Sequence, residues 1–244
     1  MRLRVAATGS AANAYVLEAE QASLILDAGV PVRRLLPCVE DFRKVVGCLL
    51  THEHGDHARA WREYARLGVK VFTSPGTVQA LAGQDALSAT GLRALSPLAA
   101  VDIGPFRVLP FGTQHDAAEP FGFLIRYLPT GETALYATDT YYLRYTFPGV
   151  HYWIVECNYL DDLVYSETDP ALRRRLKESH LSLRRLLEAL RANDLRSASK
   201  IVLVHLSDER SDEVRMVEAI HEATGVETVA ASSGADIALN PTPF

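Results

Sequence analysis

The fold that we predict for this chain rests on one segment, Thr51-His-Glu-His-Gly-Asp-His57. It follows the apolar run of residues 45–50, which is typical of a buried strand. Imidazoles and a carboxylate clustered at the end of a buried strand are costly unless something binds them, and a divalent metal would do so. This donor set suits zinc, iron or manganese. The four candidate ligands are His52, His54, Asp56 and His57.

The spacing within this stretch predicts two neighbouring ions. Residues two apart on an extended chain point the same way, so His52 and His54 can share one ion. Gly55 then allows the chain to bend, which lets Asp56 and His57 serve a second ion. A solvated loop that happens to be rich in histidine is the alternative, and the full His-x-His-x-Asp-His spacing argues against it.

Thr-His-x-His-x-Asp-His is the motif of the metallo-β-lactamase fold hydrolases, and residues 51–57 make this chain resemble that family. The resemblance implies an α/β architecture, an αβ/βα four-layer sandwich, with two divalent ions held by histidines and aspartates. It also implies that further ligands follow later strands, and three residues do so in the family's order: His115, Asp139 and His205. Each follows a β-prone segment, where functional residues of mixed α/β scaffolds usually lie.

By resemblance, seven residues would hold two ions, either zinc or manganese. The first ion would take His52, His54 and His115. The second would take Asp56, His57 and His205, with Asp139 bridging the two. An anionic bridge offsets the repulsion between two cations and holds them at the roughly 3.5–4 Å separation that two-metal hydrolysis uses.

Two aspartates have further expected roles. Asp56 is expected to be catalytic as well as a ligand. Asp27, in Leu24-Ile-Leu-Asp-Ala-Gly29, is expected by the same resemblance to orient a metal-bound histidine, as carboxylates often do. A turn residue before Gly29 is the alternative for Asp27.

Segments outside the metal motif resemble the YycJ/WalJ branch of this family. They are Phe121-Gly-Phe, Trp153-Ile-Val-Glu-Cys-Asn158-Tyr, Glu178-Ser-His180-Leu-Ser-Leu and His205-Leu-Ser. That branch is related to the family's nucleases and is associated with 5′-to-3′ DNA exonuclease activity. The chain departs from it at Tyr141, where the branch has a small residue, and the aromatic ring is expected to narrow the mouth of the site.

The resemblance implies that His180 lies beside the scissile phosphate and binds no metal. We expect it at the start of a helix, where backbone N–H groups attract an anion. Imidazole is suited to bind a phosphate oxygen or to protonate the leaving oxygen near neutral pH. A capping or surface histidine is the alternative. Two other histidines, His151 and His221, are expected to be structural.

The charge pattern leaves the substrate open. A net charge of −5 does not suggest a protein that coats nucleic acid, but bound dications would offset part of it. Arg173, Arg174 and Arg175 precede His180 and are expected to steer substrate, with a solvated face as the alternative. Arg184 and Arg185 are expected on a solvated face. Asn158 is expected to donate a hydrogen bond into the site.

Length and composition predict a single cytoplasmic domain over residues 1–244. No apolar run reaches the ~18 residues of a membrane span, and the first residues lack a signal segment. The cysteines, Cys38, Cys48 and Cys157, are odd in number and have no metal-like spacing, which favours a reducing compartment and core thiols.

The hydrophobic pattern predicts alternating strands and helices. Strands are expected at residues 3–7, 15–19, 23–27, 69–73, 152–156 and 201–204, throughout 101–137 and as a final pair. Helices are expected at residues 31–36, 58–67, 181–191 and 212–224 and after a Ser74 cap.

Together these features predict a dinuclear metal-dependent phosphodiesterase, a 5′-to-3′ DNA exonuclease-like enzyme in which a metal-bridging hydroxide attacks phosphorus. Nucleic acid is the expected partner, DNA rather than RNA, and no membrane is expected. Two alternatives stay open. One is a hydrolase of a small substrate, such as a cyclic phosphodiester, thioester or lactone. The other is a non-catalytic metal-binding regulatory module, against which the complete ligand set argues.

Overall fold

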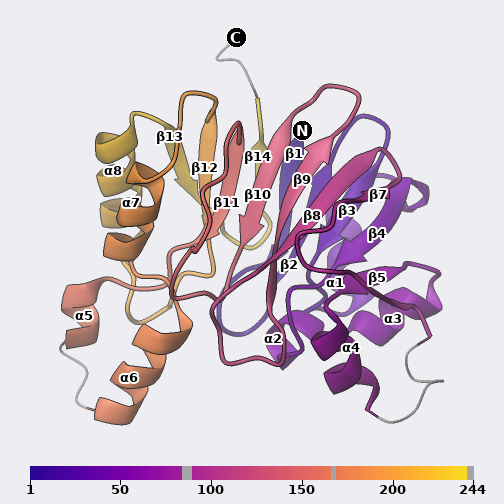
Figure 1. The fold of residues 1–244 in the computed structure, drawn as a ribbon, viewed down its shortest axis with the longest axis horizontal. Helices are drawn as coiled ribbons and strands as arrows, with labels where there is room; N and C mark the ends of the chain where they lie inside the picture. The colour runs from indigo at the N-terminus through magenta and orange to yellow at the C-terminus, as the bar shows by residue number, and fades with distance from the viewer. Residues whose placement is uncertain (84–89, 166–168, 241–244) are drawn as a thin grey trace.

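Two β-sheets of seven strands each form the centre of the computed structural model, which describes residues 1–83, 90–165 and 169–240 (Figure 1). The first sheet has the order β14-β1-β2-β3-β4-β5-β6 and the second β13-β12-β11-β10-β9-β8-β7. The first comprises β1 (Arg2–Ala7), β2 (Ala14–Glu18), β3 (Ser23–Leu26), β4 (Val45–Leu49), β5 (Val71–Thr73), β6 (Leu92–Ala94) and β14 (Asp236–Ala238). The second comprises β7 (Val101–Ile103), β8 (Phe106–Gly112), β9 (Phe121–Tyr127), β10 (Thr133–Ala137), β11 (Tyr152–Glu156), β12 (Lys200–Val204) and β13 (Glu227–Ala230).

Helices lie on the outer side of each sheet (Figure 1). Beside the first sheet are α1 (Val32–Leu35), α2 (Gly55–Ala58), α3 (Trp61–Arg66), α4 (Pro75–Ala82) and the short 3-10 turns η1 (Leu36–Cys38) and η2 (Phe42–Lys44). Beside the second are α7 (Leu183–Arg191) and α8 (Glu213–Thr224), with α5 (Asp161–Tyr165) and α6 (Pro170–Ser179) near its lower edge.

Three apolar clusters separate four layers. The central cluster lies between the sheets and includes Tyr15, Phe123 and Tyr136. A second cluster packs the first sheet against its helices, with Trp61 from α3. A third packs the second sheet against α7 and α8 and includes Leu186. These are the layers of an αβ/βα sandwich, as the sequence predicts.

Parallel strands place the polar loops along one edge. In the first sheet β3, β4 and β5 run parallel, and in the second β10, β11 and β12 do so. The carboxyl ends of parallel strands meet at the same edge of a sheet, the usual position of ligand sites in α/β proteins. Asp27 follows β3, Asp139 follows β10 and His205 follows β12 at this edge.

Most expected elements are confirmed, and two helices differ. Ser74 caps α4 as predicted, accepting a hydrogen bond from the backbone N–H of Thr77. The helix expected at residues 58–67 is broken between α2 and α3, because the backbone of Ala28 bonds to His57 and Ala60 in place of helical partners. The helix expected from residue 181 begins at Leu183, and α5 and α6 were not predicted.

Within the three described ranges, no helix combines the length and apolar character needed to cross a membrane.

Candidate metal centre

Three residues at the shared edge have an uncommon backbone conformation. Asp27, Asp139 and His205 have φ angles of 60°, 47° and 55°. Positive φ is uncommon outside glycine, and among the described residues Leu98 is the only other non-glycine example. Each of the three follows a buried strand, so the sharp turn occurs where the strand ends. Such backbone strain is concentrated at functional sites.

The first group of possible ligands is His52, His54 and His115. Nε2 of His115 lies 3.2 Å from Nδ1 of His54, and the ring centroids of His52 and His115 are 4.9 Å apart. His52 is fully buried, whereas the other two are partly exposed. Burial, followed by the charge of His57, lowers the pKa of His52, so this imidazole is held neutral. A neutral imidazole is the form that binds metal.

The second group is Asp56, His57, Asp139 and His205. Nε2 of His57 lies 3.2 Å from Asp56 Oδ2, and Nε2 of His205 lies 3.6 Å from the same oxygen. Burial would lower the pKa of His57, but the charges of Asp139 and Asp27 outweigh it and raise that pKa.

Asp139 lies between the two groups. Its Oδ2 is 2.5 Å from Nε2 of His57 and 3.6 Å from Nε2 of His52, and its Oδ1 is 3.4 Å from Nε2 of His205. The structure therefore brings together all seven residues that the sequence analysis selected.

Several donor atoms in these groups are buried without a hydrogen-bond partner. They are Nε2 of His52, Nε2 of His205 and Oδ1 of Asp139. Burying such atoms unpartnered is costly, and most buried polar atoms in proteins are bonded. A divalent cation would satisfy all three, so the donor set fits divalent metal ions.

Asp27 is buried and contacts His57 at the ring nitrogen that faces away from the cluster. Its Oδ2 lies 2.8 Å from Nδ1 of His57 and accepts a hydrogen bond from the Tyr136 hydroxyl. Its Oδ1 accepts from the backbone N–H and hydroxyl of Thr51. A carboxylate on Nδ1 fixes the ring so that Nε2 faces the cluster, which is more than a turn residue would do.

Asn158 has a similar position behind His205. Its Nδ2 lies 3.1 Å from Nδ1 of His205 and donates to that residue's backbone carbonyl. Asn13, which the sequence analysis did not select, places its Nδ2 3.1 Å from Nε2 of His57. The sequence feature that could have pointed to Asn13 is the loop at residues 8–13, which places a polar side chain between two apolar strands.

Glu156 is the main residue that the sequence analysis missed. It is fully buried at the end of β11, where its Oε2 accepts from the backbone N–H groups of Thr140 and Leu181. Its Oε1 lies 2.6 Å from Nδ1 of His180. The sequence feature that could have pointed to Glu156 is its position as the single carboxylate at the end of the apolar strand Tyr152–Glu156.

His180 lies beside the cluster but not at the start of a helix, so that part of the prediction was wrong. It follows α6, and its N–H donates to the carbonyl of Leu176. The next helix, α7, has its N-cap two residues later at Ser182. Burial would lower the pKa of His180, but the charges of Glu156 and Asp139, with Nδ1 in contact with Glu156, raise it to about 10.

A cavity of about 290 Å³ gives access to the cluster. Its lining includes ligand candidates from both groups together with His180 and two cations, Arg175 and Arg210. Arg174 instead pairs with Glu178 one helical turn away at an exposed position. Arg173 is not part of this lining. Of the three arginines expected to steer substrate, only Arg175 lines this cavity, and Arg174 lines a larger cavity beside it.

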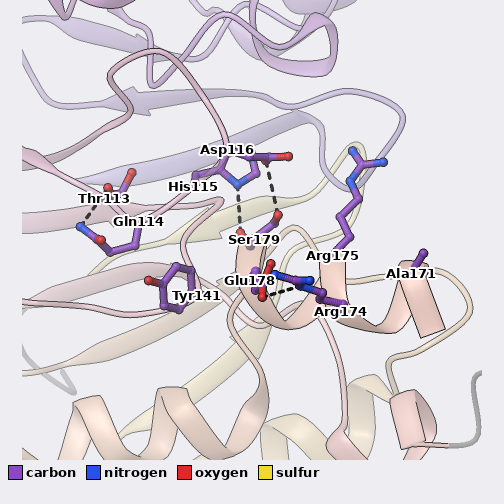
Figure 2. A pocket seen from close by; sticks show the side chains of 10 residues that line it. All are labelled: Thr113, Gln114, His115, Asp116, Tyr141, Ala171, Arg174, Arg175, Glu178 and Ser179. Carbon is purple, nitrogen blue, oxygen red and sulfur yellow. Dashed lines mark hydrogen bonds and ion pairs between the residues drawn. The ribbon is translucent and has the colours of Figure 1, made fainter.

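A second cavity, of about 530 Å³, opens beside the first and shares His115 and Arg175 with it (Figure 2). Tyr141 lines it on one side, and α6 lines it on the other along most of its length. Arg185 was expected on a solvated face, and this was wrong. Its Nη1 donates to the carbonyls of Tyr141 and Lys177, and the side chain is half-buried.

Several known proteins resemble this chain in sequence or in fold. A family model described as "Beta-lactamase superfamily domain" matches residues 23–206. Exodeoxyribonuclease WalJ of Streptococcus pneumoniae serotype 2 is 24% identical over 222 residues, which cover 85% of this chain and 82% of that protein. Zinc-bound PqqB of Methylobacterium extorquens superposes with a TM-score of 0.74 at 12% identity, covering 98% of this chain and 100% of PqqB. The short form of human tRNase Z superposes with a TM-score of 0.68 at 16% identity, covering 98% of this chain and 100% of that one.

Proposed function

Because the chain belongs to the beta-lactamase superfamily and has the metallo-β-lactamase fold, we propose that it is a dinuclear metal-dependent phosphodiesterase that degrades DNA as a 5′-to-3′ exonuclease. The relative named an exodeoxyribonuclease aligns over 85% of the chain, which supports a DNA substrate. The human enzyme named tRNase Z has the same fold and supports nucleic acid as the broader class.

The proposal assigns the seven clustered residues to two ions, zinc or manganese. His52, His54 and His115 would hold one ion, and Asp56, His57 and His205 the other, with Asp139 contacting both. PqqB, which shares the fold, binds zinc, and this supports zinc as one choice. When bound, two such ions would lower the pKa of a water molecule to make the nucleophile and offset charge on the phosphate oxygens.

One observation carries the phosphodiesterase assignment: His180 is fixed beside the cluster without belonging to the seven. Its ring stacks on that of His205 with 5.4 Å between centroids. Because Nδ1 is held by Glu156, Nε2 is the ring nitrogen available to a substrate. Two nearby carboxylates favour the protonated ring, which can bind a phosphate oxygen or give a proton to the leaving oxygen.

The surrounding side chains suit an anionic substrate. Arg175 and Arg210 line the cavity that leads to the cluster, and their charges would attract a phosphate. Glu156 acts as a positioning residue, because it contacts His180 and not the open part of the cavity. Asp27 and Asn158 would orient His57 and His205 in the same indirect way.

The size of the access cavity keeps a second candidate open. A volume of about 290 Å³ is at the small end of the usual ligand range of roughly 300–1,000 Å³. It would suit a cyclic phosphodiester, thioester or lactone as well as one end of a DNA strand. A non-catalytic module is the remaining alternative, and the complete set of seven donors argues against it.

A substrate panel separates these candidates. The protein would be assayed with zinc and with manganese against 5′-labelled and 3′-labelled DNA duplexes, matched RNA, bis(p-nitrophenyl) phosphate, a thioester and a lactone. We expect release of nucleotides from the 5′ end of DNA and slower cleavage of the model diester. Turnover of the thioester or lactone alone would overturn the proposal, and no turnover at all would favour the non-catalytic module.

A substitution then tests the role of His180. His180→Ala should leave the metal content intact and lower DNA turnover by roughly 10²–10⁴-fold, the usual contribution of an acid or base group. His221→Ala is the control, because His221 is exposed on α8. Parent-like DNA cleavage by His180→Ala would show that the mechanism drawn here is wrong.

A further inference from the structure

We propose that the cavity of about 530 Å³ beside the metal centre is a nucleobase subsite, in which the base next to the scissile phosphate stacks on Tyr141. The inference rests on the proposed function for its biological meaning. Its physical claim, that this cavity binds a base against Tyr141, can be tested by binding alone.

The cavity has the right position for a neighbouring nucleoside. It shares His115 and Arg175 with the smaller cavity over the metal cluster, so occupants of the two would be adjacent. His115 is fixed at this junction, with Nδ1 3.0 Å from the carbonyl oxygen of Ser179. A phosphate at the cluster and a base in the larger cavity would therefore lie on either side of one histidine and one arginine.

Hydrogen bonds hold the walls of the cavity in place. Tyr141 forms one wall, and its backbone N–H donates to the carbonyl of Gln114. The opposite wall is one side of α6 from Ala171 to Ser179, as Figure 2 shows. Nη1 of Arg185 lies 3.1 Å from the Tyr141 carbonyl and 2.8 Å from the Lys177 carbonyl. One guanidinium thus ties the two walls together and fixes their separation.

The ring of Tyr141 is restrained by a neighbouring side chain in a position that allows a base to stack on it. The Arg185 guanidinium also lies over this ring, 5.3 Å from its centroid, a cation–π contact that restrains the ring from outside the cavity lining. The ring is half-buried and contributes its remaining surface to the cavity. Bases stack on such aromatic platforms in proteins that bind single strands, and the contact tolerates any sequence because every base has a π face.

The chemistry of the lining favours a nucleoside over an apolar group. Besides Tyr141, the lining includes the Gln114 amide, which can bond a base edge, and the Arg175 guanidinium, which can meet a backbone phosphate. The volume lies within the range of roughly 300–1,000 Å³ usual for small-molecule sites. The thioester or lactone group itself carries neither a base to stack on Tyr141 nor a negative charge to pair with Arg175.

The test uses base stacking as a direct readout. The probe is a short single-stranded DNA with non-cleavable phosphorothioate linkages and 2-aminopurine at its 5′ end, whose fluorescence falls when the base stacks. Binding would be measured for the parent protein, Tyr141→Ala, Tyr141→Phe and Tyr142→Ala. Tyr142 is the matched control, because this neighbouring tyrosine is 54% exposed and is not part of the lining. A second probe carries an abasic site at the 5′ position.

We expect the parent and Tyr141→Phe to quench the probe and bind it alike, as should Tyr142→Ala. Tyr141→Ala should lose the quenching and bind roughly 5- to 150-fold more weakly, the usual range for removal of one stacking contact. The abasic probe should bind the parent weakly and lose nothing further in Tyr141→Ala. Equal losses with both probes, unchanged quenching in Tyr141→Ala, or no binding to the parent would overturn the subsite.

Failure of the subsite and failure of the proposed function can be told apart. If the parent cleaves DNA but Tyr141 has no effect on stacking, the nuclease assignment stands and the subsite is wrong. If the parent cleaves no phosphodiester but stacks the terminal base on Tyr141, the subsite stands and the exonuclease assignment is wrong.

Discussion

Tyr136 of the second sheet donates its hydroxyl to Asp27 of the first, with 2.6 Å between Oη and Oδ2. Both residues are fully buried, and this bond joins the two halves of the sandwich directly behind the candidate metal centre. Since Asp27 also holds Nδ1 of His57, the packing of the sheets and the orientation of a possible ligand depend on one carboxylate.

We first predict that Tyr136→Phe weakens metal binding. Loss of a residue behind a ligand usually costs 10–100-fold in affinity. About tenfold is expected here, because Thr51 still donates to Asp27. The free energy of unfolding should fall by about 1 kcal/mol. Tyr152→Phe is the control, since its hydroxyl makes a similar 2.6 Å bond to Glu132. It should lower stability alone, as measured by calorimetric metal titration and thermal unfolding, and an equal loss of affinity in both variants would contradict the prediction.

The second prediction concerns the residue between the two groups. Protein purified without chelator should contain close to two equivalents of metal, and Asp139→Asn should lose both together because a neutral amide is a poor bridge. Elemental analysis after dialysis would measure this. Asp102→Asn, in an exposed pair with Arg107, is the control and should keep parent metal content. Retention of one tightly bound equivalent by Asp139→Asn would refute the bridging assignment.

A third prediction separates positioning from metal binding. Glu156→Gln should keep the metal content and lower DNA turnover, because His180 loses the carboxylate that fixes Nδ1. The double variant with His180→Ala should be no slower than His180→Ala alone, as expected for residues that act as one unit. Single-turnover kinetics on labelled DNA would measure this, and additive losses would show that Glu156 acts by another route.

The fourth prediction distinguishes two neighbouring arginines. Arg175→Ala should raise the Michaelis constant for DNA and reduce the slope of log affinity against log salt by about 0.7–0.9, the effect of one lost phosphate contact. Arg173→Ala should change neither, since Arg173 lines neither the access cavity nor the larger cavity beside it. Salt titrations of binding would measure the slopes. Equal changes in the two variants would point to a diffuse charge effect.

The metal cluster could be predicted from sequence because its donors have unusual local contexts. His52 to His57 form one dense motif, and His115, Asp139 and His205 each follow a β-prone segment. The direction of the strands then brings these residues together, since parallel strands have their carboxyl ends at one edge. The four layers were implied by the family resemblance of residues 51–57, and the order of the predicted strands and helices fitted them.

What sequence missed depends on tertiary contacts. Glu156 ends an apolar strand, and only the fold shows that it meets His180 from a separate helix connection. His180 was expected at the start of a helix because the N-cap of α7, Ser182, is only two residues away. The residue that contacts His180 cannot be recognised from the sequence. Arg185 looked like a surface charge, since one of the two carbonyls it bonds, that of Tyr141, is 44 residues away in the sequence.

The left-handed backbone at Asp27, Asp139 and His205 has a consequence for the lifetime of the protein. Each such residue costs on the order of 1–3 kcal/mol, and bound ions would stabilise the folded chain by mass action against that cost. Protein made under metal starvation should therefore populate the unfolded state more often, and cellular proteases would remove it faster. The abundance of the enzyme, and not only its turnover, would then follow the metal supply.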